Sequence, residues 1–579
     1  MRARHILAGL VLTSAAALGA AREWGPDQTR PILEKTLVVR LAPALDSLSP
    51  GERRALDALV AAGAPLQRIY ERQLHRQALD THRALLARQP RRDDLLTLYR
   101  LWQGPIATTL DNEREPFLPV DPIVPGKNVY PWGIDKARLE SFLEEHGEAK
   151  DDILNGRTVV RDAGDVPADL AALAARPGLA ALHPELETRI RAGAAGYYAI
   201  PYALAYANEL DEAGARLLEA ASAVRAEDED LADYLENRRR DFLTNDYESG
   251  DASWIMGSFG NLNAQIGSFE TYDDELMGVK SFMSHSVMVR DAERTRALRA
   301  ALRGLQSIED ALPCEPHRKV RETIPVGVYN VVADFGQARG TNTASILPNE
   351  PRITRKYGRT ILLRYNIMTH PDLHAISQAT WSAAMAPAHE ADLGTEGNFY
   401  RTLWHEIGHY LGPDRDRGGR DLGVALQEDA DLFEELKSDL VSLFAAQALR
   451  TSGDFDEARL KDVHAAGILR VLQKNQPRRG QPYQTMQLMQ MNYFLEGGLL
   501  RFDATSGRLK IQYERYPAVV SSMLEKVLAI QAAGDKGAAD AFIDRYDAWT
   551  EELHERLARA MRATERYRYR LVQYQALGE

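Results

Sequence analysis

The sequence predicts an α+β protein that is mainly α and is built from more than one domain. Helical periodicity runs through long segments that contain few helix breakers, whereas the segments that favour strands are few and mostly short. The chain has 579 residues, of which 45% are hydrophobic, so it can bury a large core. Chains of this length normally divide into several domains or lobes.

The expected helices carry apolar residues at intervals of three and four positions. They cover residues 66–88, 136–146, 203–241, 291–311, 399–411, 426–449 and 517–572. In the segment 399–411, Asn398 is a plausible N-cap, and Gly412 followed by Pro413 is a stop signal. This segment is therefore expected to be a helix with defined ends.

Strands are expected where β-branched and aromatic residues cluster. Two short ones cover residues 158–160 and 197–200, and two longer ones cover 325–335 and 359–365. Segments with turn-forming residues between these elements are expected to be loops, with a short helix inside the second of them. These loops cover residues 104–133, 162–182 and 412–423.

The helix 399–411 contains the run Trp-His-Glu-Ile-Gly-His at residues 404–409. Residues four apart share one helix face, so His405 and His409 can converge on one ion while Glu406 lies beside them. This spacing is the signature of a zinc hydrolase. The alternative is an ordinary amphipathic helix in which two histidines occur by chance.

The helix expected at 426–449 carries acids at spacings of three and four, namely Glu428, Asp431, Glu435 and Asp439. Such a stripe could face the histidine helix and supply a third zinc ligand. Taken alone, the stripe favours the alternative of a solvated face, which is the usual place of acids on a helix.

Two histidines and one carboxylate would leave zinc a fourth position for water. The pKa of that water would fall to roughly 7, so hydroxide would be available at neutral pH. Glu406 would accept the proton of the water and pass it to a leaving amine, as in the hydrolysis of a peptide bond.

Residues 434–439 read Glu-Glu-Leu-Lys-Ser-Asp and follow the histidine helix. This pair of motifs resembles the dipeptidyl peptidase III family of zinc metallopeptidases. The resemblance implies one Zn²⁺ per chain, with His405, His409 and Glu435 as ligands and Glu406 as the catalytic base. Glu434 and Asp439 would hold the outer nitrogens of the two imidazoles. The five-residue His-Glu-x-x-His form looks like some bacterial members and like domains fused to nudix modules.

Residues 69–73, 266–280 and 346–350 also look like segments of this family, so the similarity runs from about residue 35 to the C-terminus. It implies two lobes around a wide cleft. The lobe with a small β-barrel and helices would comprise residues 22–285, 325–368 and 545–579. The helical lobe, with the catalytic zinc, would comprise residues 286–324 and 369–544.

The chain departs from the family where the family holds the substrate. Asn263 and Gln265 stand in the places of a glutamate and a tyrosine that hold the amino terminus of the peptide and stabilise the transition state. The family's Asn-x-Pro-Asn segment reads Ile-Leu-Pro-Asn at 346–349, so only Asn349 remains. A histidine expected near 482–486 is missing.

Asn349 and Glu270 remain as candidate residues for binding the substrate. Each has an ordinary structural alternative, since asparagine often forms turns and glutamate is usually a surface acid. The resemblance also implies that the substrate is a short peptide, bound in extended form between the lobes.

Three functions are compatible with these residues. The first is a zinc exopeptidase of the dipeptidyl peptidase or aminopeptidase type that acts on short peptides. The second is a zinc hydrolase of a non-peptide amide, which the missing substrate residues favour. The third is a catalytically silent protein that binds peptides. The presence of Glu406 argues against the third, because binding alone needs no base.

The amino terminus has the pattern of a secretory signal peptide at residues 1–21. Arg2, Arg4 and His5 form a positive region, residues 6–18 are apolar, and small residues follow at 19–21. The alternatives are an uncleaved anchor and a frayed helix. The protein is therefore expected to be exported, to the periplasm of a Gram-negative source or outside the cell.

Composition limits the remaining possibilities. The net charge of −12 argues against nucleic acid as a partner. No later apolar run is long enough to span a membrane, which needs roughly 20 residues. Cys314 is the only cysteine, so no intramolecular disulfide can form.

Overall fold

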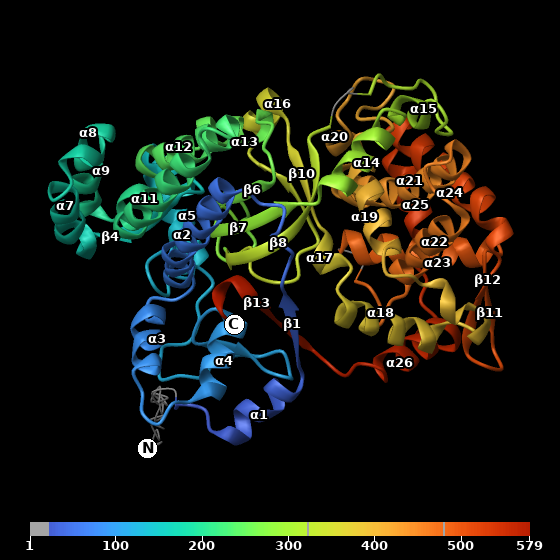
Figure 1. The fold of residues 1–579 in the computed structure, drawn as a ribbon, viewed down its shortest axis with the longest axis horizontal. Coiled ribbons are helices and arrows are strands. Elements are labelled where there is room, and N and C mark those ends of the chain that lie inside the picture. The colour runs from blue at the N-terminus through green and yellow to red at the C-terminus, as the bar shows by residue number, and fades with distance from the viewer. Residues whose placement is uncertain (1–21, 321–323, 479–480) are drawn as a thin grey trace, which may run out of the picture.

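The computed structural model describes residues 22–320, 324–478 and 481–579. The predicted signal peptide, residues 1–21, lies outside the described residues. Helices dominate and gather in two lobes on either side of a central sheet (Figure 1). The predicted class, mainly α with smaller β elements, is confirmed.

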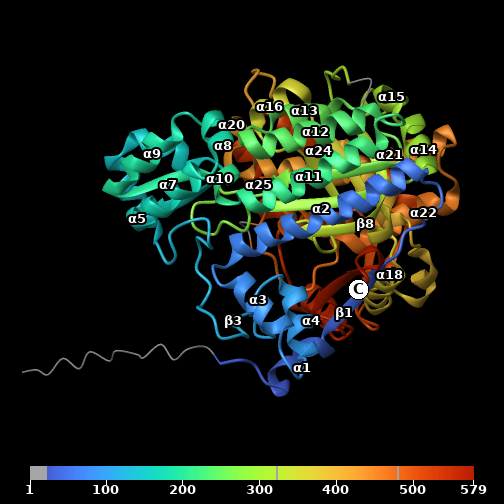
Figure 2. The same ribbon diagram turned by 60° about the vertical axis from the view of Figure 1, so that its left-hand side comes forward.

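The first lobe is organised around the long helix α2 (Pro50–Leu74). This helix packs against α11 (Ala207–Val224), as Figure 2 shows, and it also contacts the strands β7 (Met283–Arg290) and β8 (Val326–Gly336). A capping box at Ser49 satisfies the first free amides of α2 and fixes where the helix starts.

The central sheet has the order β6-β7-β8-β10-β9, with β6 at Leu262–Ser268, β10 at Thr360–Arg364 and β9 at Ala344–Leu347. β8 and β10 are parallel, and the other pairs are antiparallel. In the described part of the chain β6 and β9 are the edges, so the sheet is open. The small β-barrel implied by the resemblance is therefore not found as a closed barrel.

The sheet forms the boundary between the cores of the two lobes. Ile361 and Leu363 of β10 are buried in the core of the helical lobe, whereas Leu362 between them is buried in the core of the first lobe. Alternate side chains of a strand point to opposite faces, so one strand contributes to both cores. The central sheet is therefore part of the hydrophobic core of both lobes and connects them.

The helical lobe is built around α21 (Ala430–Ser452). The helices α19 (Gly397–Gly408), α22 (Glu457–Val471), α23 (Pro482–Glu496) and α24 (Tyr516–Ala533) pack against it. Thirteen of the residues of α21 are buried, including charged ones, so this helix runs through the centre of the lobe.

The other elements surround these centres. Those on the side of the first lobe are α1 (Pro26–Glu34), β1 (Thr36–Leu41), α3 (Ala78–Leu86), α4 (Asp93–Trp102), β2 (Ile106–Thr108), β3 (Arg114–Pro116), α5 (Lys136–Glu145), α6 (Lys150–Leu154), β4 (Thr158–Asp162), α7 (Val166–Ala174), α8 (Pro177–Leu182), α9 (Leu186–Ala192), β5 (Tyr197–Pro201), α10 (Tyr202–Ala205), α12 (Glu229–Thr244), α13 (Glu248–Met256), α16 (Pro351–Tyr357) and α17 (Tyr365–Met368). Those of the helical lobe are α14 (Ala292–Leu302), α15 (Leu305–Glu309), α18 (Pro371–Ala384), α20 (Leu422–Leu426), β11 (Leu500–Asp503), β12 (Arg508–Ile511), α25 (Lys536–Tyr546) and α26 (Arg556–Arg562). No helix within the described ranges has the length and apolar character needed to cross a membrane.

The last strand, β13 (Tyr569–Tyr574), returns to the first lobe and pairs in parallel with β1. The end of the segment predicted to be helical at 517–572 is thus a strand. Leu557 and Met561 of α26 are buried in the core of the helical lobe, and α26 packs on α18. Part of the segment 545–579 therefore contributes to the core of the helical lobe.

The expected strands 158–160, 197–200, 325–335 and 359–365 correspond to β4, β5, β8 and β10. The expected helices were too long: the one at 66–88 is interrupted at His75, whose backbone is extended, and the one at 203–241 is interrupted at 225–228. β6 was missed although Leu262, Ala264 and Ile266 alternate with polar residues, because Ile266 is its one β-branched residue and the strand signal is weak.

The contact between α2 and β8 leaves no space at Gly63. A Cβ added there would lie 2.1 Å from Cε2 of Phe335, so the helix backbone rests against the aromatic ring. Interiors are packed too densely to absorb an extra methyl group without a shift of their neighbours. Gly63 therefore sets the distance between the helix and the sheet.

We predict that Gly63→Ala lowers the free energy of unfolding by about 1–3 kcal/mol, because the methyl group overpacks this contact. The matched control is Gly178→Ala in α8, since Gly178 is exposed and its added Cβ meets no atom within 4 Å. The control should be neutral or slightly stabilising. Thermal unfolding midpoints measure both, and equal midpoints for the two variants would contradict the prediction.

Candidate metal centre

The histidine helix α19 begins at Gly397, two residues before the expected start, and its N-cap is Glu396 instead of Asn398. It ends at Gly408, so His409 is the C-cap and still has a helical backbone conformation. A Cβ at Gly408 would lie 3.0 Å from the backbone of Ser438 in α21. Glycine between the two histidines therefore lets α19 approach α21 closely.

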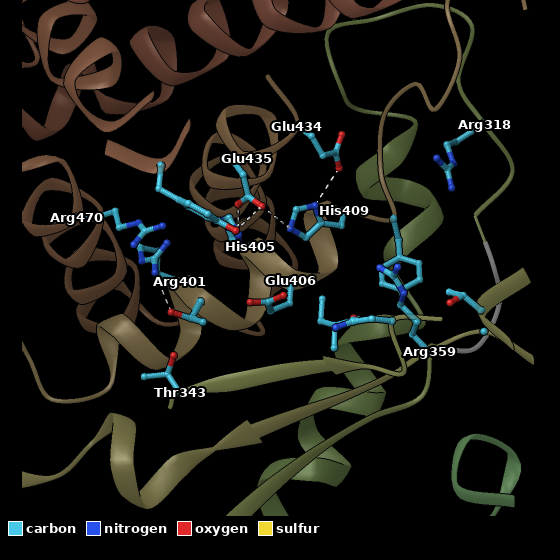
Figure 3. Close-up of a pocket in the computed structure, with 17 residues that line it drawn as sticks. Arg318, Thr343, Arg359, Arg401, His405, Glu406, His409, Glu434, Glu435 and Arg470 are labelled. Carbon is cyan, nitrogen blue, oxygen red and sulfur yellow. Dashed lines mark hydrogen bonds and ion pairs between the residues drawn. The ribbon is translucent and has the colours of Figure 1, made fainter. Parts of the chain in front are cut away.

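This approach brings together His405, His409 and Glu435, whose candidate ligand atoms all lie within 4.8 Å of one another. Nε2 of His405 is 3.1 Å from Oε2 of Glu435, and Nε2 of His409 is 3.9 Å from its Oε1. The two imidazole rings are nearly perpendicular, at 86°. Figure 3 shows both rings and the carboxylate meeting at one point.

The chemistry of these atoms fits a zinc ion. Two imidazole nitrogens and one carboxylate oxygen are the ligand set of catalytic zinc sites, with a fourth position left open. Oε2 of Glu435 is buried and makes no hydrogen bond in the described part of the chain, although it faces the imidazole of His405. A buried carboxylate oxygen without a hydrogen-bond donor is costly unless a cation compensates it.

The outer nitrogens of both imidazoles face carboxylates. Nδ1 of His405 lies 2.7 Å from Oδ1 of Asp439, and Nδ1 of His409 lies 2.9 Å from Oε1 of Glu434. Such contacts fix the orientation of a ring so that its other nitrogen can bind metal. Glu434 and Asp439 thus each contact the outer nitrogen of one histidine.

Asp439 is itself held by two arginines. Nη1 of Arg401 donates to its Oδ1 at 3.0 Å, and Nε of Arg470 lies 3.3 Å from its Oδ2. Burial acts to raise the pKa of Asp439, but the charges of His405 and Arg470 hold it well below its usual range. Asp439 therefore stays an anion that can accept from His405.

Glu434 is supported in a similar way. Lys437 donates to its Oε1 at 2.8 Å and also to the carbonyl of Leu411 at 2.9 Å. Burial acts to raise the pKa of Glu434, yet Lys437 and His409 lower it to about 2. Lys437 thus links the end of the histidine helix to the acid that orients His409.

The acidic stripe of α21 divides in the structure. Glu435 and Asp439 face α19, whereas Asp431 is exposed and Glu428 pairs with Lys536 at 3.2 Å. Glu428 precedes the start of α21, so it does not continue the face formed by the others. Of the four acids in the predicted stripe, only Glu435 and Asp439 therefore face the histidine helix.

A cavity of about 750 Å³ opens in front of the ligand group, and Glu406 lines it together with His405, His409 and Glu435. Figure 3 shows Glu406 beside the two imidazoles. The opposite wall includes Thr343, Ile346, Asn349 and Arg359, which come from the sheet and its connections. The cavity therefore lies between the two lobes.

No protein-family model matches the chain. The structure is similar to that of dipeptidyl peptidase III from Caldithrix abyssi, with a TM-score of 0.80, 23% sequence identity, and coverage of 95% of this chain and 99% of that one. A second similar structure is dipeptidyl-peptidase III from Corallococcus sp. strain EGB, with a TM-score of 0.71, 22% identity, and coverage of 96% and 99%.

The chain has the dipeptidyl peptidase III fold. Among curated proteins it is similar to Nudix hydrolase 3 of Arabidopsis thaliana, with 26% identity over 437 residues, or 74% of this chain. The chain spans about half of that relative, since the match covers 55% of its length.

Within the dipeptidyl peptidase III fold, the two departures in β6 have structural roles in this chain. Asn263 accepts from the indole of Trp254 and donates to the hydroxyl of Tyr329, and Gln265 accepts from Arg364 at 3.4 Å. Both amides are buried and do not line the cavity. They are therefore engaged inside the first lobe.

Asn349 and Glu270 contact each other, with the amide of Asn349 donating to Oε2 of Glu270 at 3.0 Å. Burial raises the pKa of Glu270, and the hydrogen bond from Asn349 opposes this rise. Asn349 also lines a second cavity of about 540 Å³. Of the pair, Asn349 borders the cavity of the metal centre.

Sequence reasoning missed Tyr483, Arg401 and Arg470. The hydroxyl of Tyr483 donates to Oε1 of Glu435 at 3.1 Å from the segment 482–486, where a histidine was expected and is missing. Burial, with the charge of Glu435, raises the pKa of Tyr483 to about 12, so the phenol remains a donor. No signal in the sequence identified the two arginines, because their role depends on contact with Asp439.

We predict that Glu434→Gln weakens zinc binding by about tenfold, because the neutral side chain orients His409 less strongly. The matched control is Asp431→Asn, which removes one acid from the exposed face of the same helix. Competition with a chelator of known affinity measures both. Equal affinities in Glu434→Gln and the wild type would show that Glu434 does not support the ligand.

Proposed function

We propose that the protein is a zinc-dependent exopeptidase that hydrolyses short peptides and resembles dipeptidyl peptidases in its action. The observation that supports this most directly is the convergence of His405, His409 and Glu435 in one cavity with Glu406. The dipeptidyl peptidase III fold adds to the proposal, because the two similar structures are named as peptidases of that type.

In this proposal His405, His409 and Glu435 hold Zn²⁺, and Asp439 and Glu434 fix the two rings. Zinc bound there would supply a Lewis acid for the scissile carbonyl and would lower the pKa of water to about 7. Glu406 accepts the proton from water and returns it to the leaving amine.

The other residues position these groups and exclude water. Tyr483 keeps one oxygen of Glu435 oriented through its hydrogen bond. The peptide would lie between the metal helices and the segment that contains Asn349, whose side chain can bond to the backbone of an extended chain. Glu270 would hold Asn349 in place and add negative charge for the amino terminus of the peptide.

A zinc hydrolase of a non-peptide amide is the second candidate. It is favoured by the engagement of Asn263 and Gln265 inside the first lobe, since these positions would hold the peptide terminus in the family. A silent peptide-binding protein is less consistent with the structure, because Glu406 lines the cavity beside a complete ligand set.

We predict that the zinc-loaded protein cleaves peptides in a mixed library of short sequences and that mass spectrometry detects amino-terminal dipeptides among the products. Glu406→Ala should lower the rate by at least about 100-fold with zinc still bound, since it removes the general base. Treatment with a chelator should abolish turnover. No cleavage by the wild type with zinc bound would reject the peptidase and direct attention to other amides.

We also propose that the protein is exported, from the pattern of residues 1–21 alone. We predict that the protein made by its source begins near Arg22, after removal of the signal peptide. Mass determination of the natural protein measures this, and a chain that retains residues 1–21 inside the cell would contradict export.

A further inference from the structure

Arginine is concentrated around the cavity of the metal centre, although the chain as a whole has a net charge of −12. Of the residues that the structure describes, four arginines line the cavity, namely Arg318, Arg359, Arg401 and Arg470. Figure 3 shows Arg401 and Arg470 on one side of the metal ligands and Arg318 and Arg359 on the other. The two sides differ in how these charges are compensated.

On the first side the charges have a partner. Arg401 and Arg470 both contact Asp439, which also orients His405. Arg401 is buried, and its guanidinium pairs with Asp439 inside the helical lobe. These two arginines therefore belong to the support of the metal centre.

On the second side the charges are less compensated. Arg318 donates to the carbonyl of Gly412 at 3.2 Å, and its contact with Asp414, at 3.9 Å, is long and lies at an exposed carboxylate. Arg359 is exposed to the cavity and makes neither a hydrogen bond nor an ion pair with any residue in the described ranges. A free guanidinium in a cleft is a donor for a carboxylate of a ligand.

The position of Arg359 is fixed although its guanidinium has no partner among the described residues. It follows α16 and immediately precedes β10, so its backbone is held by the helix and by the central sheet. Glu248 pairs with Arg352 and with Lys356, and it accepts from the hydroxyl of Tyr357. These contacts attach α16 to the first lobe.

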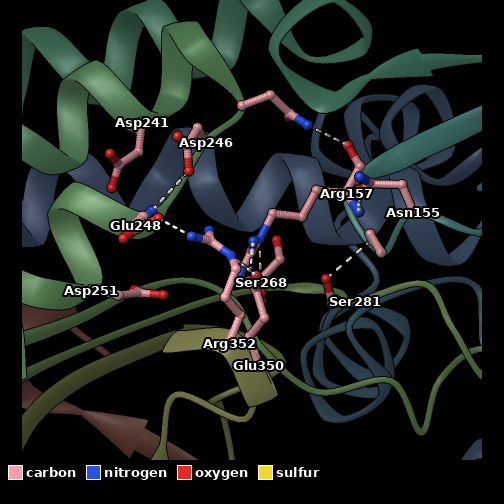
Figure 4. Close-up of polar contacts among 12 residues, drawn as sticks. Asn155, Arg157, Asp241, Asp246, Glu248, Asp251, Ser268, Ser281, Glu350 and Arg352 are labelled. Atoms are coloured by element: carbon pink, nitrogen blue, oxygen red, sulfur yellow. Dashed lines mark hydrogen bonds and ion pairs between the residues drawn. The ribbon is translucent and has the colours of Figure 1, made fainter. Parts of the chain in front are cut away.

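The start of α16 is held by further contacts, which Figure 4 shows. Arg157 donates to the carbonyl of Ser268 at 3.3 Å and to Glu350 at 3.4 Å, and it stacks on Tyr247. Arg352 and Lys356 anchor the same helix through their ion pairs with Glu248. Arg359 is left to face the cavity.

We propose that Arg359, assisted by Arg318, forms a subsite that selects peptides with a carboxylate on this side of the metal centre. The carboxylate is either the C-terminal group of a short peptide or an acidic side chain. This inference rests on the proposed peptidase function and adds a substrate class to it. Guanidinium groups match carboxylates in geometry as well as in charge, which a lysine does not.

The experiment compares pairs of peptides that differ in one group only. In the first pair a C-terminal carboxylate is replaced by a carboxamide, and in the second an internal aspartate is replaced by asparagine. We expect the wild type to have the higher kcat/KM for the carboxylate member of one pair. The pair that shows the preference identifies the source of the carboxylate.

Arg359→Gln should lower kcat/KM for that carboxylate peptide by about fivefold or more, mainly through KM, and leave its neutral partner within about twofold. Arg359→Lys should keep part of the preference, because it keeps the charge without the paired donors. The matched control is Arg355→Gln, since Arg355 is exposed on the same helix and does not line the cavity. The control should behave as the wild type.

An equal loss for both members of every pair, or no loss in Arg359→Gln, would overturn the subsite while the peptidase proposal stands. If the zinc-loaded wild type cleaves none of the peptides, the proposed function fails instead. The subsite can then still be tested by binding. Calorimetry measures the affinity of the Glu406→Gln protein for the same peptides, with and without the Arg359→Gln substitution. Equal affinity for carboxylate and neutral members in that measurement would reject it.

Discussion

The candidate site depends on the close packing of α19 on α21. Gly408 makes this approach possible, because any side chain there would meet the backbone at Ser438. The contact brings two imidazoles of one helix against Glu435 of the other, and it also brings Glu434 and Asp439 to their outer nitrogens. A single distance between two helices therefore sets both the ligand group and the contacts that orient it.

The charges around this contact form a connected set. Asp439 is negative because two arginines and an imidazole face it, and Glu434 is negative because Lys437 faces it. Burial of so many charges is tolerated only when each has a partner, since a lone buried ion is costly. The buried Glu435 oxygen without a hydrogen bond departs from this rule, and a cation between the ligands would restore it.

The central sheet determines what faces the candidate metal ligands. β10 contributes alternate side chains to the two cores, so the wall of the cavity formed by residues 343–359 is attached to both lobes. The anchoring of α16 by Glu248 extends this attachment to the segment around Asn349 and Arg359. Residues of that wall that bind a substrate would therefore be held by a rigid part of the fold. Accurate positioning of a reacting bond requires such rigidity.

The class of the fold, the histidine helix and the pairing of His405 with His409 could be predicted from the sequence, because helical spacing is local information. Glu435 as the third candidate ligand was implied only by the resemblance of the two motifs to a known family. The sequence did not determine the helix breaks at residues 75 and 225–228, the buried strand β6 or the strand β13, since these depend on packing against distant segments. Only the tertiary structure showed that Asn263 and Gln265 are engaged in the interior and that Tyr483 reaches Glu435. It also separated the two arginines that contact Asp439 from Arg318 and Arg359 on the other side of the cavity, because the compensation of a charge depends on its neighbours in space.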